Sequence, residues 1–351
     1  MPEAGRGNFF EDFRPGQRLV HPVPRTVTAG DAALYVALTG SRFPVPCAEP
    51  VARALGFPAQ PVDDLLVFHV VFGRTVADVS LNALANLGYA ECRFGAPVYP
   101  GDTLATESEV VGVRETSNGR SGVVWVRSVG RKQAGAMVLD YVRWVLVAKR
   151  DEASPAPAPV VPTLADAVRP ADVIVPEGLE GRGYDTRATG SLALWDDYEI
   201  GERIDHIDGV TVEEAEHMMA TRLYQNTARV HVDQHRQGAS GRGRRLVYGG
   251  HVISLARALS FNGLANAFRV AAINGGRHVA PCVAGDTVYA WSEVMAKAEL
   301  AGRDDLGLLR VRTVAAKNHG CDDFPLKADG KDHPAVILDL DLWLLMPRRA
   351  G

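Results

Sequence analysis

A ten-residue stretch, Tyr224–Asp233, brings together the side chains in this sequence that are best suited to proton transfer. It reads Tyr-Gln-Asn-Thr-Ala-Arg-Val-His-Val-Asp and contains Asn226, Arg229, His231 and Asp233. An imidazole titrates near neutral pH, so His231 is the candidate general base. An amide cannot transfer a proton, but Asn226 can hold a water molecule by donating to it and accepting from it. The stretch therefore predicts a site at which a water molecule is activated.

A glycine pair lies at the expected start of an apolar helix, within Tyr248-Gly249-Gly250-His251. Glycines let a ligand approach the backbone closely, and the first amides of a helix are free to donate to an anion. Gly249 and Gly250 are therefore candidate donors to a negatively charged oxygen. The alternative is that both serve only the turn. We interpret His251 as part of the first helical turn.

Composition and charge narrow the class of protein. The net charge of −4 over 351 residues provides no overall basic field for nucleic acid or an anionic membrane. The four cysteines are scattered without metal-ligand spacing, which favours reduced thiols. The N-terminus lacks a signal-peptide pattern, and no apolar run approaches the roughly 20 residues of a membrane helix. We therefore expect a cytoplasmic protein without a metal site and without nucleic-acid or membrane partners.

Three segments of the first half recur, in the same order, in the second half. The pairs are Phe10–Arg18 with Trp195–Arg203, Arg93–Leu104 with Arg277–Val288, and Val138–Trp144 with Ile337–Trp343. Their offsets are 185, 184 and 199 residues (195 − 10, 277 − 93 and 337 − 138). The larger last offset predicts an insertion of about fifteen residues (199 − 184) in the second copy, around Lys317–Lys331. The chain is therefore a tandem pair of similar units.

The domain organisation follows from this repeat. We predict an N-terminal unit over residues 1–150, a linker over residues 151–192 and a C-terminal unit over residues 193–351. The linker contains Ser154-Pro155-Ala156-Pro157-Ala158-Pro159, a composition typical of an extended spacer.

Both halves have the same expected order of elements. The expected helices are Asp31–Leu38 and Leu65–Val76 in the first half, and Glu213–Arg222 and Val252–Leu264 in the second. Thr28 and Thr211 are placed to cap the first helix of each half. The second helix is apolar nearly all round and should be buried. Alternating strands such as Gly122–Val129 and Gly307–Val314 follow in a run, which predicts an α+β fold with an antiparallel sheet around one buried helix per half.

The segment Arg93–Leu104, which reads Arg-Phe-Gly-Ala-Pro-Val-Tyr-Pro-Gly-Asp-Thr-Leu, resembles the MaoC-like, or R-specific enoyl-CoA hydratase, family. The helix–strand order and the duplication share this resemblance. Within the family the chain is similar to the mesaconyl-CoA hydratases, also called β-methylmalyl-CoA dehydratases, over Gly7–Phe13, Pro61–Gly73 and Asn86–Glu91. The resemblance covers the chain outside the linker. It implies a tandem (double) hotdog, in which each half wraps an antiparallel sheet around a long helix.

The resemblance also assigns roles within the stretch Tyr224–Asp233. The family signature reads Asp-x-Asn-Pro-x-His, and its Asp and His flank an activated water. His231 falls on the His position, whereas Asn226 stands at the Asp position. In the first half the same positions are Ser41 and Pro46. The resemblance therefore implies a catalytic C-terminal hotdog and a degenerate, non-catalytic N-terminal one.

The implied function is that of a hydro-lyase that reversibly adds water to a short, branched, dicarboxylic enoyl-CoA, with mesaconyl-CoA to β-methylmalyl-CoA as the expected reaction. No cofactor is expected, because coenzyme A is part of the substrate. His231 is expected to act through the water held by Asn226, or with a carboxylate from elsewhere. The candidate carboxylates are Asp233, which is alternatively a capping group, and the pair Asp63-Asp64.

Other groups are assigned to substrate binding. An amide of Gly249 or Gly250 would stabilise the enolate-like thioester oxygen. Arginines near the signature are candidates for the free carboxylate, because a guanidinium matches a carboxylate in geometry; they are Arg229, Arg222 and Arg42. The cluster Arg242, Arg244 and Arg245 is a candidate for the 3′-phosphate of coenzyme A or, alternatively, a solvated surface loop.

Two other function classes remain open from the sequence. A hotdog acyl-CoA thioesterase needs a carboxylate aimed at the thioester, and few acids lie near His231. A non-catalytic acyl-CoA-binding protein would account for the degenerate first half and for Asn226. A homodimer is the expected assembly.

Overall fold

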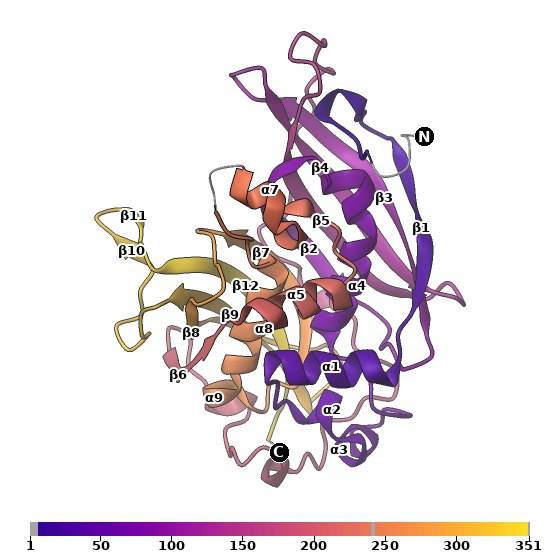
Figure 1. Ribbon diagram of the computed structural model, residues 1–351. Coiled ribbons are helices and arrows are strands. Elements are labelled where there is room, and N and C mark those ends of the chain that lie inside the picture. Colours follow the sequence, from indigo (N-terminus) through magenta and orange to yellow (C-terminus); the bar gives the residue numbers. More distant parts are fainter. Residues whose placement is uncertain (1–5, 240–242, 350–351) are drawn as a thin grey trace.

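The computed structural model describes residues 6–239 and 243–349. Its main feature is a ten-stranded antiparallel sheet with the strand order β1-β3-β4-β5-β2-β7-β12-β9-β8-β6 (Figure 1). The first half supplies β1 (Arg18–Thr26), β2 (Ala83–Phe94), β3 (Thr103–Glu115), β4 (Ser121–Lys132) and β5 (Met137–Ala148). The second half supplies β6 (Arg203–Thr211), β7 (Arg269–His278), β8 (Thr287–Glu299), β9 (Leu306–Lys317) and β12 (Val336–Pro347). Both halves thus order their strands alike, and the predicted α+β class is confirmed.

The two halves meet where β2 pairs with β7. These strands are antiparallel, with Ala90 opposite Gly275 and Cys92 opposite Ile273. Each is the last strand of its own five-stranded unit in the sheet order. The pairing therefore joins the two units into one continuous sheet.

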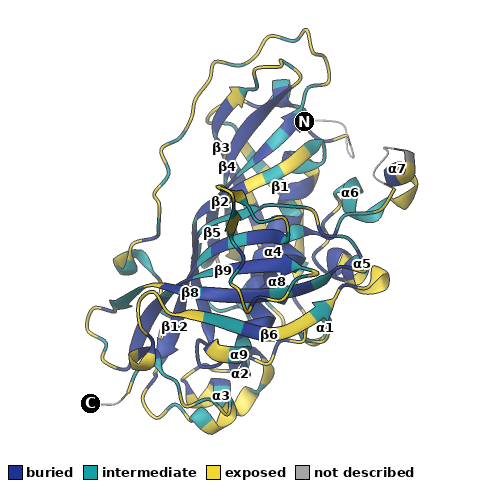
Figure 2. Ribbon diagram, turned by 90° about the vertical axis from the view of Figure 1, so that its left-hand side faces the viewer, coloured by how far each residue is buried: buried dark blue, intermediate teal, exposed yellow. Residues whose placement is uncertain are grey.

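Two helices lie against the sheet and form the core with it. They are α4 (Asp64–Thr75) and α8 (Gly249–Leu259), and nearly all of their side chains are buried (Figure 2). The first agrees with the helix expected over Leu65–Val76. The second ends at Leu259, earlier than predicted. The short helix α9 (Phe261–Leu264) that follows is itself kinked, because Asn262 and Gly263 leave the helical conformation and Gly263 adopts a φ of +98°.

Two outer helices, α1 (Ala29–Thr39) and α5 (Glu214–Leu223), contact each other across the halves. The Thr28 cap is confirmed, since its hydroxyl accepts from the Asp31 amide at 3.1 Å. The prediction for Thr211 is wrong. Thr211 ends β6, and its hydroxyl lies 2.8 Å from that of Thr287, as Thr26 lies 2.7 Å from Thr103 in the first half. The counterpart of Thr211 is therefore the strand residue Thr26.

Short helices follow the outer helices at corresponding places in the two halves. They are α2 (Pro44–Cys47) and α3 (Glu49–Ala54) in the first half, and α6 (Arg229–Val232) and α7 (Gln234–Ala239) in the second. A small hairpin of β10 (Lys327–Ala328) and β11 (Lys331–Asp332) projects from the second half alone (Figure 1). This hairpin lies where the repeat offsets predict an insertion.

The linker between the halves packs on the rest of the molecule. Val160 forms an isolated bridge with Val113 on β3. The indole of Trp343 donates to the carbonyl of Val168 at 2.9 Å. Gly56, at a φ of +90°, lies so close to Gly178 that an added Cβ would come within 2.0 Å of its carbonyl oxygen. The linker is therefore anchored along its length.

Candidate active site

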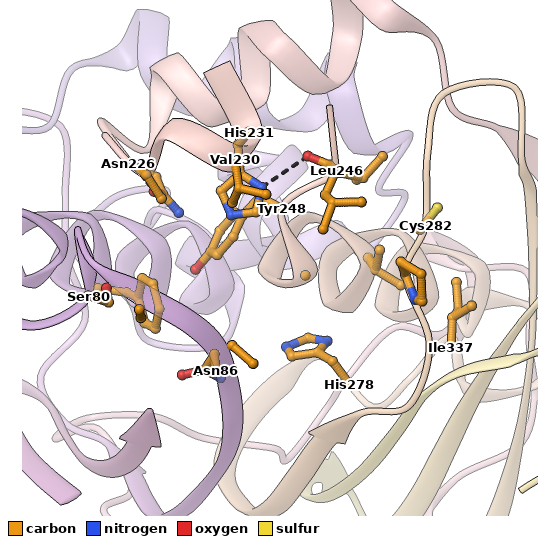
Figure 3. A pocket seen from close by; sticks show the side chains of 18 of the residues that line it. Ser80, Asn86, Asn226, Val230, His231, Leu246, Tyr248, His278, Cys282 and Ile337 are labelled. Atoms are coloured by element: carbon orange, nitrogen blue, oxygen red, sulfur yellow. Dashed lines mark hydrogen bonds between the residues drawn. The ribbon is translucent and has the colours of Figure 1, made fainter. Parts of the chain in front are cut away.

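A cavity of about 420 Å³ lies at the start of α8 and is lined by both halves (Figure 3). The second half contributes residues of α6, the segment before α8, and the end of β7. The first half contributes residues of α4, β2 and β5. The lining residues with polar side chains are Ser80, Asn86, Tyr89, Arg143, Asn226, His231, Tyr248, His278 and Cys282. The predicted stretch Tyr224–Asp233 thus forms one wall of the cavity.

His231 lies on α6, and its imidazole faces the cavity (Figure 3). Nδ1 donates to the backbone carbonyl of Leu246 at 2.9 Å. This bond holds the proton of the neutral ring on Nδ1, so Nε2 keeps its lone pair. Burial lowers the pKa of His231 to about 4, and the ring is therefore neutral at pH 7. His231 is in the state that a general base requires.

The turn at Asn226 explains how His231 is presented. Gln225 adopts a φ of +52°, which ends the path of α5. The Asn226 side-chain oxygen then accepts from the Ala228 amide at 3.0 Å, which leads the chain into α6. Asn226 is buried, and its amide nitrogen is the group that points into the cavity (Figure 3). Asn226 can therefore donate to the oxygen of a water, while its own oxygen holds the backbone.

Gly249 and Gly250 are the first two residues of α8, so their amides have no acceptor within the helix. Gly249 lines the cavity. A Cβ at Gly249 would lie 2.5 Å from Cε1 of His278, and a Cβ at Gly250 would lie 2.4 Å from Cζ of Tyr248. Beyond the amide donors that the sequence suggested, these glycines make room for two aromatic rings at the cavity.

A second imidazole, that of His278 at the end of β7, lies across the cavity from His231 (Figure 3). The Tyr89 hydroxyl is hydrogen-bonded to its Nε2 at 3.1 Å. Burial lowers the pKa of His278 to about 4, so this ring is also neutral at pH 7. Sequence reasoning missed His278, although the repeat contained a signal: its counterpart at the offset of 184 (278 − 94) is the apolar Phe94.

Three cavity residues carry buried polar atoms without a hydrogen-bond partner among the described residues. They are Nε and Nη1 of Arg143, both amide atoms of Asn86, and the hydroxyl of Tyr248. Such groups are uncommon in native proteins, and each calls for an explanation. None of the three was singled out from the sequence as a site residue. For Arg143 the signal was a cation within the apolar strand β5, where the second copy has Leu342 (342 − 143 = 199).

Several sequence-predicted residues lie outside the cavity lining. Asp233 caps α7, accepting from the Arg236 amide at 3.0 Å. Arg222 is exposed on α5, and Arg229 is half-buried on α6. Gly250 lies next to the lining but not in it.

The basic groups proposed for other contacts are placed as follows. The guanidinium of Arg42 lies over the Phe261 ring at 4.6 Å. Arg245 donates to Glu214 at 2.5 Å, and the exposed Arg244 donates to the carbonyl of Ala284 at 2.5 Å. Arg242 lies outside the described residues.

The equivalent place in the first half is a much smaller pocket of about 20 Å³. Pro46 stands there in place of His231, and Asp64 in place of Gly249. Asp64 lies 3.3 Å from Arg269, and Arg257 lies over the Phe43 ring at 3.5 Å. Burial raises the pKa of Asp64 to about 6. Asp63 and Asp64 thus lie in this charged cluster, away from His231, and no carboxylate lines the larger cavity among the described residues.

No group of three or more His, Cys, Asp or Glu in the described part of the chain is arranged to hold a metal ion. The four cysteines are free thiols. None of the helices in residues 6–239 and 243–349 has the length and hydrophobicity that a bilayer crossing requires.

Comparison with known proteins gives a consistent result. The family model described as mesaconyl-CoA hydratase matches residues 3–326. The chain is 60% identical over 344 residues to a β-methylmalyl-CoA dehydratase of Chloroflexus aurantiacus, covering 98% of both. It is 59% identical over 349 residues to a mesaconyl-CoA hydratase of Cereibacter sphaeroides, covering 99% of this chain and 100% of that one.

Solved structures agree with the fold. A MaoC-domain dehydratase from Chloroflexus aurantiacus superposes with a TM-score of 0.97 at 59% identity, over 100% of both chains. A protein of Mycobacterium tuberculosis described as a double hotdog superposes with a TM-score of 0.77 at 25% identity, over 97% of this chain and 98% of that one.

Proposed function

Because this chain belongs to the mesaconyl-CoA hydratase family, we propose that its cavity binds mesaconyl-CoA and that His231 activates the water that adds to it. The reaction is the reversible hydration of mesaconyl-CoA to β-methylmalyl-CoA by a double hotdog enzyme. The observation that carries the assignment of His231 is its fixed tautomer: Nδ1 is bound to the Leu246 carbonyl and Nε2 is left to face the cavity.

The chemistry proceeds from these groups. The amide nitrogen of Asn226 donates to a water oxygen, and that water donates to Nε2 of His231. As the oxygen bonds to Cβ of the substrate, Nε2 takes the proton. A depressed pKa makes the resulting imidazolium a strong acid, so His231 returns this proton to Cα and no second acid is required. Dehydration follows the same steps in reverse.

The thioester oxygen gains negative charge between these two proton transfers. The first amides of α8, at Gly249 and Gly250, are the proposed donors to it, aided by the positive end of the helix dipole. Loss of one such donor typically costs about 3 kcal/mol of transition-state stabilisation. The mechanism uses protein groups alone, with no cofactor beyond the coenzyme A of the substrate.

Two alternatives differ from hydration in what they release. A thioesterase needs a carboxylate near the thioester, and the described lining contains none. A non-catalytic acyl-CoA-binding protein would not need the fixed tautomer of His231. We also propose a cytoplasmic location, which the four free thiols favour. We further propose that the protein is a homodimer, and size-exclusion chromatography with light scattering tests this.

The test compares the wild-type protein with His231→Ala and with His235→Ala, a matched control on α7 whose imidazole is exposed and outside the lining. Hydration consumes the absorbance of the enoyl-thioester without releasing thiol. We expect His231→Ala to lose roughly 10²- to 10⁴-fold in turnover and His235→Ala to match the wild type. Unchanged turnover in His231→Ala would remove this residue from the mechanism. Release of free thiol by the wild type would instead identify a thioesterase.

A further inference from the structure

Arg143 is a buried cation whose counter-ion is absent from the described residues. It lies on β5 with its side chain fully buried. Its Nη2 donates to the hydroxyls of Thr75 at 2.8 Å and Ser80 at 3.2 Å, and its guanidinium lies over the Phe72 ring at 4.1 Å. None of these partners is charged. A guanidinium stays protonated even when buried, so the position retains an uncompensated positive charge.

The same wall of the cavity has further unused hydrogen-bonding capacity. Nε and Nη1 of Arg143, the hydroxyl of Tyr248 and the side-chain amide of Asn86 have no partner among the described residues. All three residues line the cavity. Figure 3 shows the Tyr248 hydroxyl on the side of the cavity that holds Ser80 and Asn86. A cation with two neutral donors around one space is suited to an anion with several acceptor oxygens, and a carboxylate is such an anion.

The position of this charge relative to the base restricts which anion can reach it. Tyr248 packs edge-on against His231, with ring centroids 5.6 Å apart, while its hydroxyl extends away from that contact. In mesaconyl-CoA the free carboxylate is bonded to Cβ, the carbon that water attacks. A substrate with Cβ beside His231 therefore has its carboxylate within a few bonds of the base, on the reacting end of the acyl group. The phosphates of coenzyme A lie at the opposite end of the substrate.

We propose that Arg143, together with Tyr248 and Asn86, binds the free carboxylate of the substrate and makes the enzyme selective for dicarboxylic over monocarboxylic enoyl-CoA thioesters. This inference rests on the proposed hydratase function and deepens it. It also gives the first half a part in the site, because Arg143 and Asn86 lie on β5 and β2.

Selectivity is measured most directly with matched pairs of ligands. Tiglyl-CoA has a methyl group where mesaconyl-CoA has its carboxylate, and butyryl-CoA stands in the same relation to succinyl-CoA. The saturated pair cannot be hydrated, so their competitive inhibition constants report binding alone. For the wild type we expect succinyl-CoA to bind roughly a hundredfold or more tightly than butyryl-CoA. We expect the same preference in kcat/KM for mesaconyl-CoA over tiglyl-CoA.

The decisive variant is Arg143→Met, which keeps much of the side-chain volume and removes the charge. We expect the succinyl-to-butyryl binding ratio to fall by roughly a hundredfold. Arg143→Lys, which keeps a charge, retains part of the ratio. Arg127→Met is the matched control, because Arg127 lies on the adjacent strand β4, pairs with Asp140 at 2.5 Å and is outside the cavity. It leaves the ratio unchanged.

The outcomes separate the two proposals. An unchanged ratio in Arg143→Met, or an equal loss of affinity for both ligands, overturns the carboxylate assignment. If that variant does not fold, Tyr248→Phe keeps the ring and removes only the hydroxyl, and it must narrow the ratio by roughly tenfold. If the wild type fails to hydrate mesaconyl-CoA, the proposed function is wrong, while the binding ratio still decides whether the anion site exists.

Discussion

Lowering the pH tests the state of His231 without changing any atom of the protein. An ordinary histidine, with a pKa of about 6.5, would be roughly 90% protonated at pH 5.5 and would have lost most of its activity as a base. Burial lowers the pKa of His231 to about 4. With that value roughly 97% of the rings are still neutral at pH 5.5. The two cases differ by about tenfold at this one pH.

The assay is kcat/KM for mesaconyl-CoA from about pH 3 to 8, since this parameter reports ionisations of the free enzyme. We expect kcat/KM to stay within twofold between pH 7.5 and 5.5 and to fall about tenfold per unit below pH 4. The sign follows from the direction of the shift: a base with a depressed pKa stays active as the pH falls, until the pH reaches that pKa. Half-maximal activity near pH 6.5 would refute the argument that burial keeps His231 neutral.

Acid also acts on stability, which the experiment has to control. Burial lowers the pKa of His206, which does not line the cavity, to about 4. The unfolded chain binds this proton and the folded chain does not, so stability falls as the pH drops from about 6.5 towards 4. Each sample is therefore returned to pH 7.5 after incubation. Full recovery of activity there excludes irreversible unfolding as the cause of the loss at low pH, and an unchanged circular dichroism spectrum at the assay pH excludes reversible unfolding.

Three substitutions probe other parts of the structure. Asn226→Asp introduces the signature carboxylate beside His231 and should keep partial activity while moving the acid limb of kcat/KM to higher pH, because a nearby carboxylate favours the imidazolium; complete loss would show that the amide itself is needed. Gly56→Ala places a Cβ within 2.0 Å of the Gly178 carbonyl oxygen, on a residue whose φ is +90°. It should lower the free energy of unfolding by about 2 kcal/mol or more, measured by urea denaturation, and an unchanged midpoint would contradict this packing. Arg257→Met leaves the buried acids of the first-half pocket without this cation and should destabilise by about 3 kcal/mol in the same assay, whereas a gain in stability would mean that the charged cluster is a net cost.

Features that depend on local pattern could be predicted from the sequence. The repeat predicted two similar units, and the apolar run Leu65–Val76 predicted a buried helix because its period and length are local properties. The Thr28 cap is also local, because Thr28 and Asp31 lie three residues apart in the sequence. The Thr211 prediction failed because Thr211 can be aligned with either Thr26 or Thr28 of the first half. Only the contact of Thr211 with Thr287 on the neighbouring strand shows that its counterpart is Thr26.

The candidate site was predictable only on one side. His231 and Asn226 lie in one continuous motif, so the sequence brought them together. Arg143 and Asn86 come from strands of the other half, and they reach the cavity only because β2 pairs with β7. Nothing in the sequence near either residue indicates that pairing. The alternating pattern does show Arg143 among apolar neighbours, but not what its charge would face.

The two units that the pairing of β2 with β7 joins belong to one chain, and this also bears on how such a site can evolve. In an assembly of two identical chains, every substitution appears twice, once on each side of the symmetry axis. A duplicated chain is free of that constraint. Arg143 can occupy one copy while Leu342 fills the same place in the other, and His231 can coexist with Pro46. A mutation that improves one cavity therefore does not have to be tolerated at the equivalent place in the other half. The first-half pocket can be filled by its own charged cluster and serve a structural role.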